Sequence, residues 1–438
     1  MTPAGYSSWS DLTSELLVSI AATDGVSLRD YASLRGVCTA WRSALAPMSY
    51  PCLLSVERRH YIHVVSVFSP PLRRSFHLHT GPSFVVGPKV RYRGHAQVVG
   101  SASGRLAIAI DRTAFSHYST RRIFLVDSRA GKKVQLVSPA GDNEIVSKIV
   151  FAPNPNLMPS GHNNGCTAVA LYGRRSRVAY IDTGGSSTTE EKDWTTVDVP
   201  DGSTSYDAIM AYIDTVGSST TEENEWTTVD VPDGRHYDDM AYHAGDDKVY
   251  LLSSRGSVDV LGMPRGDQPA VIEPLASLVP VPNPISAYAP PYDAVSTTIT
   301  SKHIFFCHGS LYQVWRNICV DVKLIRLRPC LEISADQIFV LRYDPGRWPR
   351  WDAVKDLGGC SVFLSQTGSP AVVRPGVPEV TPDCVYWIDR QDVPMVCDIA
   401  TGVSKPWMVP NGTCEEVECW YVDHDDATII DCEIEGTN

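Results

Sequence analysis

The pattern of hydrophobic and polar residues changes near residue 50, from helical spacing to short β-type runs. Before that point, Leu12, Leu16 and Ile20 recur every four residues, and Leu17 lies beside them. A four-residue spacing keeps side chains on one face of an α-helix. The first segment therefore predicts a short amphipathic helix that begins near residue 12.

A second helical segment follows, and its start is marked by polar residues. Ser27 and Asp30 have the S-x-x-D spacing of a capping box, in which each side chain accepts a hydrogen bond from an otherwise unpaired backbone N–H. Pro47 ends the run, because its ring disfavours helical backbone at the preceding residue. The apolar stripe of this segment contains Leu34, Cys38, Trp41 and Leu45, and Val37 and Ala44 widen it.

After Pro51 the chain is a series of short runs rich in Val, Ile, Phe and Leu, separated by Gly, Pro, Asp, Asn and Ser. The predicted strands are 62–68, 83–86, 97–99, 105–110, 122–126, 167–172, 178–182, 248–253, 258–261, 303–306, 337–343, 384–388 and 395–397. No strand–helix alternation appears, which excludes a doubly wound sheet or a βα-barrel. Similar units recur roughly every 40 to 50 residues, the spacing of four-stranded propeller blades. A pair of two-sheet sandwiches is the rival architecture.

One stretch is duplicated almost without change. Residues 179–202 recur as residues 211–234, with differences only at Gly184/Val216, Lys192/Asn224 and Asp193/Glu225. Architectural repeats diverge further than this, so we interpret the pair as a tandem duplication in which one copy is surplus to the fold. The surplus copy is expected to loop out, because a long surface insertion adds little closure entropy. An added edge hairpin, a register shift or a new binding loop are the alternatives.

Composition limits the class of function. The 438 residues are 43% hydrophobic and 20% charged, which is typical of a globular chain. The formal net charge of −12 argues against nucleic-acid binding, which needs clustered Lys and Arg. The sequence shows neither a signal peptide nor an apolar run of about 18 residues, so no membrane association is expected. The 12 scattered cysteines predict free thiols and an intracellular protein of the nucleus or cytoplasm.

Linear catalytic motifs are absent. The sequence contains no G-x-S-x-G elbow, no phosphate-binding glycine loop and no H-E-x-x-H. The nearest approach to a metal site is the set Cys414, Cys419, His424 and Cys432. Its C-x4-C spacing is at the margin of a zinc knuckle, so we expect free thiols instead. We predict no catalytic activity, no metal and no cofactor.

The helical segment resembles the F-box. The matching residues are Leu12, Glu15 to Leu17, Ile20, Leu28, Leu34, Arg35, Val37, Cys38, Trp41 and Arg42. F-box proteins bind a Skp1-type adaptor, and through it the cullin of an SCF-type ubiquitin ligase. The family usually has proline after its first leucine, where this chain has Thr13; proline pre-organises the first helical turn. The resemblance implies adaptor contacts by Leu12, Leu16, Leu17, Ile20, Leu28, Leu34, Val37, Cys38 and Trp41.

The remainder resembles a set of plant proteins in which an F-box precedes a kelch-like, KIB-type β-propeller. The motifs that carry this likeness begin at Lys148 (Lys-Ile-Val-Phe-Ala-Pro), Thr167, Trp194, Tyr237 (Tyr-Asp-Asp-Met-Ala-Tyr-His) and Val385. We therefore expect a mainly β protein with an F-box module at 8–46, a linker at 47–59, a propeller of uncertain blade count at 60–410 and an acidic segment at 411–438.

The expected function is that of a non-catalytic receptor, which presents an unidentified protein substrate to the ligase. Two alternatives remain open. A propeller interaction protein could have lost its place in a ligase, and a propeller hydrolase or lyase could assemble its site from distant loops.

Overall fold

The computed structural model describes most of the helical segment and most of the β-rich body. The described residues are 12–23, 26–45, 52–59, 62–69, 74–78, 84–85, 96–102, 104–113, 119–127, 133–137, 139, 145–153, 166–173, 177–183, 226–232, 235–264, 270–275, 287–319, 321–324, 330–365, 368–377, 379–389, 393–407 and 417–421.

Three short helices form a head at the N-terminal end of the chain: α1 (Ser14–Ala21), α2 (Leu28–Gly36) and α3 (Thr39–Ala44). The predicted capping box of α2 is confirmed. The Ser27 hydroxyl accepts from the backbone N–H of Asp30 at 3.2 Å, and the Asp30 carboxylate accepts from the backbone N–H of Ser27 at 3.0 Å. The other described helix, α5 (Tyr292–Thr298), lies in the β-rich body.

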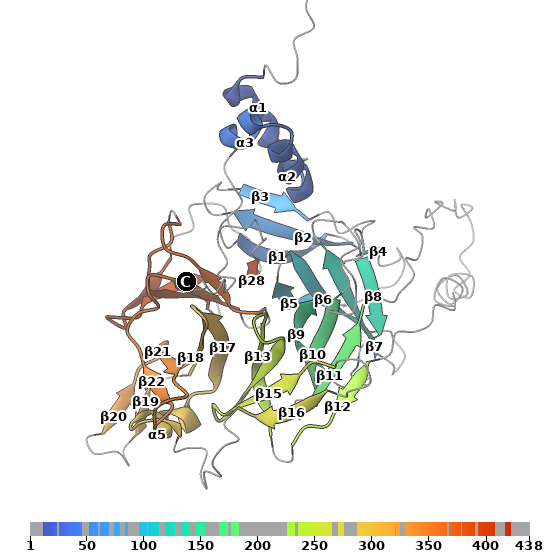
Figure 1. Ribbon diagram of the computed structural model, residues 1–438. Helices are drawn as coiled ribbons and strands as arrows, with labels where there is room; N and C mark the ends of the chain where they lie inside the picture. Colours follow the sequence, from blue (N-terminus) through green and yellow to red (C-terminus); the bar gives the residue numbers. More distant parts are fainter. Residues whose placement is uncertain are drawn as a thin grey trace, which may run out of the picture.

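The β-rich body is a six-bladed propeller, with the three helices set on one side of it (Figure 1). Each blade is a sheet of four or five strands, and a separate two-stranded sheet pairs β19 (Val322–Leu324) with β20 (Leu331–Ile333). The ring of separate sheets replaces the rival sandwich architecture and fixes the blade count that the loose sequence period left open.

Apart from β28, the blade strands follow chain order from blade 1 to blade 6. Blade 1 contains β1 (Cys52–Arg59), β2 (Ile62–Ser69), β3 (Arg74–His77), β4 (Phe84–Val85) and β28 (Val417–Tyr421). Blade 2 contains β5 (Ala96–Ala102), β6 (Arg105–Thr113), β7 (Ser119–Asp127) and β8 (Lys133–Val137). Blade 3 contains β9 (Val146–Pro153), β10 (Cys166–Tyr172), β11 (Arg177–Asp182) and β12 (Thr227–Val229).

Blade 4 contains β13 (Tyr237–His243), β14 (Lys248–Ser253), β15 (Val258–Gly262) and β16 (Val271–Pro274). Blade 5 contains β17 (Ser301–Cys307), β18 (Ser310–Arg316), β21 (Ile338–Tyr343) and β22 (Trp351–Ala353). Blade 6 contains β23 (Ser361–Leu364), β24 (Ala371–Val373), β25 (Cys384–Ile388), β26 (Pro394–Asp398) and β27 (Ser404–Pro406).

Neighbouring blades touch through the edge strands β28, β5, β9, β13, β17 and β24, which form the inner ring. The approach is close between blades 2 and 3, where a methyl group added at Gly100 would overlap the backbone carbonyl of Ile149. Glycine is therefore required there by space. Among the described strands the pairs are antiparallel except in blade 6, where β23 runs parallel to β25.

The two ends of the β-rich body meet in blade 1, which closes the ring. Strand β28 pairs antiparallel with β1, so that Leu53 faces Trp420 and Leu54 faces Cys419. The Trp420 indole N–H also donates to the carbonyl of Leu364 in blade 6 at 3.0 Å. One side chain thus ties the last blade to the first.

The closure corrects the predicted domain limits. Residues 52–59, expected in a linker, form β1, and residues 417–421, expected in an acidic segment, form β28. Both were misplaced because a single pair of strands from opposite ends of the chain completes one sheet. Long-range pairing of this kind leaves no local sequence signal.

Blade 3 contains as many strand residues from the duplicated segment as one copy could supply, but these residues come from both copies. Strand β11 uses the start of the first copy and β12 the end of the second, with Val178 facing Val229 and Ala179 facing Thr228. The residues between them, 184–225, lie outside the described part of the chain, so the predicted looping out of the surplus copy stays a prediction.

Candidate functional site

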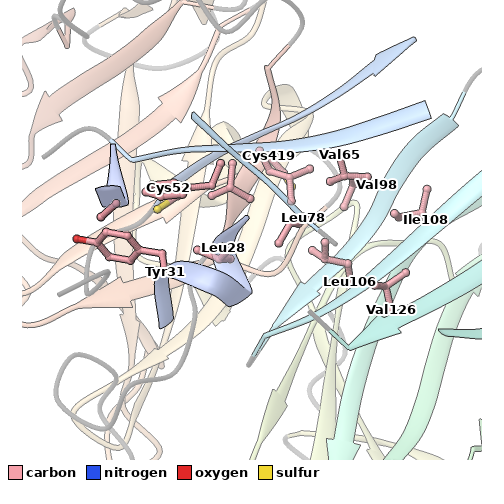
Figure 2. Close-up of a cluster of buried hydrophobic side chains, with 14 of the residues drawn as sticks. Leu28, Tyr31, Cys52, Val65, Leu78, Val98, Leu106, Ile108, Val126 and Cys419 are labelled. Carbon is pink, nitrogen blue, oxygen red and sulfur yellow. The ribbon is translucent and has the colours of Figure 1, made fainter. Parts of the chain in front are cut away.

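The head packs one apolar face onto blade 1. Leu17, Leu28 and Trp41 are buried, and they belong to the same apolar cluster as Cys52, Leu54 and Phe76 of the propeller. Figure 2 shows Leu28 and Tyr31 of α2 beside Cys52, Leu78 and Cys419. The Tyr31 and Phe76 ring centroids are 5.1 Å apart. The propeller therefore provides much of the burial that so small a helical module cannot provide for itself.

The head also carries apolar side chains that its own fold leaves in solvent. Leu16 is 54% exposed, Ile20 40% and Val37 58%. Val18, on another side of α1, is 48% exposed. Among the described residues nine large hydrophobic side chains are exposed, and four of them lie in this short head. Exposed apolar side chains gathered in so short a segment make the head a candidate interaction surface.

The nine residues predicted to contact an adaptor divide into three groups. Leu16, Ile20 and Val37 are exposed; Leu12, Leu34 and Cys38 are partly buried against the cluster; Leu17, Leu28 and Trp41 are buried in it. Hydrophobic spacing alone could not divide them, because two faces of α1 carry apolar residues at the four-residue spacing. Leu16 and Ile20 form one row, whereas Leu17 and Ala21 form the other.

Thr13, which stands where F-boxes usually have proline, is the N-cap of α1. Its hydroxyl accepts from the backbone N–H of Leu16 at 3.4 Å, and its carbonyl accepts from the backbone N–H of Leu17 at 3.0 Å. Thr13 therefore caps the helix with its side chain, where proline would have pre-organised the first turn. The long side-chain bond indicates a weak cap.

A second notable feature is a buried ion pair on the inner ring. Lys148 of β9 donates to the carboxylate of Asp239 in β13, and both side chains are almost fully buried. His303 of β17 lies with its Nδ1 3.4 Å from the same carboxylate, which also accepts from the backbone N–H of Ile304 at 3.0 Å. The backbone N–H of Met240 donates to it at 2.8 Å. One carboxylate therefore joins three blades.

The electrostatics of this cluster are those of a compensated buried charge. Burial alone would raise the pKa of Asp239, but the neighbouring Lys148 and His303 hold the pKa of that carboxyl below its ordinary value. Burial lowers the pKa of the nearby Lys302 ammonium to about 8. Because the Asp239 carboxylate is surrounded by donors from the fold, we interpret it as a structural connection between blades.

The described residues contain one candidate group of metal ligands, formed by Cys307, His308 and Cys360. A hydrogen bond from Cys307 lowers the pKa of the Cys360 thiol, and so does the adjacent His308 imidazole. Their combined effect exceeds the rise caused by burial, so that this pKa is about 7. Of the cysteine set considered from the sequence, Cys419 is buried in the blade 1 core. Cys414, His424 and Cys432 lie outside the described residues.

No helix within the described residues is both long and apolar enough to cross a membrane.

Comparison with known proteins gives a family match over the propeller. The family model described as KIB1-4 beta-propeller matches residues 67–409. No curated protein matches the chain closely enough to count as a relative.

Solved structures overlap the chain only loosely. A Bacteroides fragilis protein assigned as a 6-phosphogluconolactonase has a TM-score of 0.35 and 11% identity, covering 86% of this chain and 98% of its own. The Cps50 (Swd1) beta-propeller domain of Myceliophteria thermophila has a TM-score of 0.30 and 12% identity, covering 82% and 96%. Similarities this low carry no inference about activity.

Proposed function

The chain belongs to the KIB1-4 beta-propeller family, and we propose that it acts as the substrate-recognition subunit of an SCF-type cullin–RING ubiquitin ligase. In this role the helical head binds a Skp1-type adaptor, and the propeller, a protein-interaction domain, binds the target protein. The subunit has no reaction of its own to catalyse. Its effect is to hold the target close to the ubiquitin-charged enzyme in a productive orientation.

The exposed apolar residues of the head are the observation that supports this proposal. Leu16, Ile20 and Val37 lie in the segment that resembles an F-box, and no described part of the propeller covers them. Covering apolar surface contributes roughly 25 cal/mol per Å², although ordering and desolvation offset part of the gain. A few such side chains at the centre of an interface can dominate its affinity.

The head packs against blade 1 in a shared apolar core, which supports a receptor role. Because Leu28, Tyr31 and Trp41 share a core with the propeller, a bound adaptor and a bound target would be held in a fixed relation. A loosely tethered head would give no such orientation.

The decisive experiment substitutes the exposed row of α1. Leu16→Asp combined with Ile20→Asp should abolish co-purification of the full-length protein with a Skp1-type adaptor and cullin. Trp41 is unsuited to the same test because it is buried. The matched control is Val403→Asp in blade 6, whose side chain is 61% exposed and far from the head in sequence.

If the double variant still recruits the adaptor as wild type does, the proposed docking surface is wrong. The result is readable only if circular dichroism and the thermal midpoint match those of wild type.

The weak cap at Thr13 favours one alternative, a propeller interaction protein that does not assemble into a ligase. In that case the folded wild-type chain would bind neither the adaptor nor the cullin, while still retaining its own protein partner.

A further inference from the structure

The turn between β17 and β18 presents a histidine beside a cysteine. Cys307 pairs with Ser310 across the turn, and the two residues between them, His308 and Gly309, have positive φ angles of 48° and 67°. Two left-handed residues in a two-residue loop form a type I′ hairpin, which is tight and well defined. The positions of Cys307 and His308 relative to each other are therefore fixed by the backbone.

Cys360 reaches the same place from blade 6, and hydrogen bonds that do not involve its thiol hold it there. The carboxylate of Asp383 accepts from the backbone N–H groups of Leu357 at 2.6 Å and Gly359 at 2.9 Å. The backbone N–H of Asp383 donates to the carbonyl of Cys360 at 2.9 Å. This loop is built to place one side chain precisely where the blade 5 turn arrives.

The three side chains form a cage of the size a tetrahedral metal ion needs. The Cys360 Sγ and His308 Nε2 atoms are 3.3 Å apart, and one ligand atom from each of the three residues lies within 4.8 Å of the others. Zinc bonded to sulfur at about 2.3 Å and to nitrogen at about 2.0 Å separates neighbouring ligand atoms by roughly 3.5 to 3.8 Å. A small adjustment of side chains would meet that geometry.

The surroundings leave one side of the cage open. Cys307 and Cys360 are buried, whereas His308 is exposed, so an ion can enter past the imidazole. Gly358 lies directly against that ring: a methyl group added there would come within 3.2 Å of His308 Nε2.

We propose that Cys307, His308 and Cys360 bind one zinc ion, with the fourth position filled by water or an exogenous ligand. Two sulfur ligands and one imidazole select a soft or borderline ion such as zinc over magnesium or calcium. Binding forms two Zn–S bonds and one Zn–N bond, releases the two thiol protons to solvent and involves no redox change. Because Cys307 and His308 come from blade 5 and Cys360 from blade 6, the ion ties the two blades together.

The experiment uses the full-length protein, reduced, stripped with a chelator and then loaded with Zn²⁺ alone. Wild type should retain one equivalent of zinc after dialysis, measured by elemental analysis, and zinc should raise its thermal midpoint. Co²⁺ in place of Zn²⁺ should give thiolate-to-cobalt charge-transfer absorption. Cys360→Ser and Cys307→Ser should each lose both the retained equivalent of zinc and the rise in thermal midpoint that zinc causes.

Two further variants keep the result readable. His308→Ala changes an exposed residue, so it should fold normally and bind zinc at least about tenfold more weakly. Cys397→Ser removes a buried cysteine of blade 6 outside the cage and should retain the full equivalent. Absence of retained zinc in wild type, or an unchanged equivalent in folded His308→Ala and Cys360→Ser, would overturn the proposal.

Discussion

The centre of the propeller and the helical head differ in how they accommodate energetically unfavourable groups. The centre pairs its buried charge within the fold, whereas the head leaves apolar side chains in solvent. At the centre, the buried carboxylate of Asp239 is surrounded by donors from three blades, so the fold itself compensates the charge. On the head, Leu16, Ile20 and Val37 remain in solvent although one face of the same helices is sealed on blade 1. A region whose buried charges are paired within the chain has a structural role. A region that leaves apolar side chains uncovered points to a partner.

The largest effect is expected from breaking the central ion pair. Asp239→Ala leaves the buried Lys148 ammonium without its partner, and we expect about 3 to 5 kcal/mol of lost folding free energy. Urea unfolding measures the loss. Asp238→Ala, at the adjacent exposed position, is the control and should cost less than about 1 kcal/mol.

The same variant predicts a pH dependence with a definite sign. Since the folded-state pKa of Asp239 lies below its ordinary value of 3.8, its stabilisation is present above that pH and is lost as the pH falls below it. The stability difference between wild type and Asp239→Ala should therefore shrink in acid. A difference that grows as the pH falls would show that the carboxylate is not the compensated charge described here.

An intermediate effect is expected from the two rows of α1. Leu17→Ala removes a buried side chain and should lower the stability of the head by about 2 to 4 kcal/mol. Hydrogen exchange in α1 to α3 measures this loss. Leu16→Ala is its matched partner one residue away and should cost less than about 0.5 kcal/mol. Equal losses would mean that the two faces of the head do not differ as the structure indicates.

The smallest effect is expected from removing one copy of the duplication. Deleting residues 184–215 joins Thr183 to Val216 and restores a single copy between β11 and β12. The thermal midpoint should stay within about 2 °C of wild type, because loop length contributes little to stability. A large loss would show that the second copy has become part of the fold.

The sequence predicted local features well and long-range ones poorly. The helices, the Ser27–Asp30 capping box and the all-β body follow from spacing and turn residues, which act within a few positions. The closing pair of β1 and β28 joins residues more than 350 positions apart, and no local pattern marks it.

The buried ion pair also could not be predicted from local sequence, although both of its residues lie in segments that resemble the propeller family. Lys148 begins one of the segments that resemble the propeller family and Asp239 lies in another, yet the two are 91 positions apart. Nothing in either segment indicates their contact until the strands are arranged in a ring. The Cys307 and Cys360 thiols were missed for the same reason, because they are brought together by neighbouring blades.

Residue-level footprinting of the head would show directly whether an adaptor covers its exposed apolar side chains. Full-length protein would be labelled with a side-chain-reactive probe, with and without a saturating Skp1-type adaptor, and read by mass spectrometry. We expect strong protection of Leu16, Ile20 and Val37 on adaptor binding and no change at Val403. Unchanged labelling of those three side chains in the presence of bound adaptor would contradict this expectation.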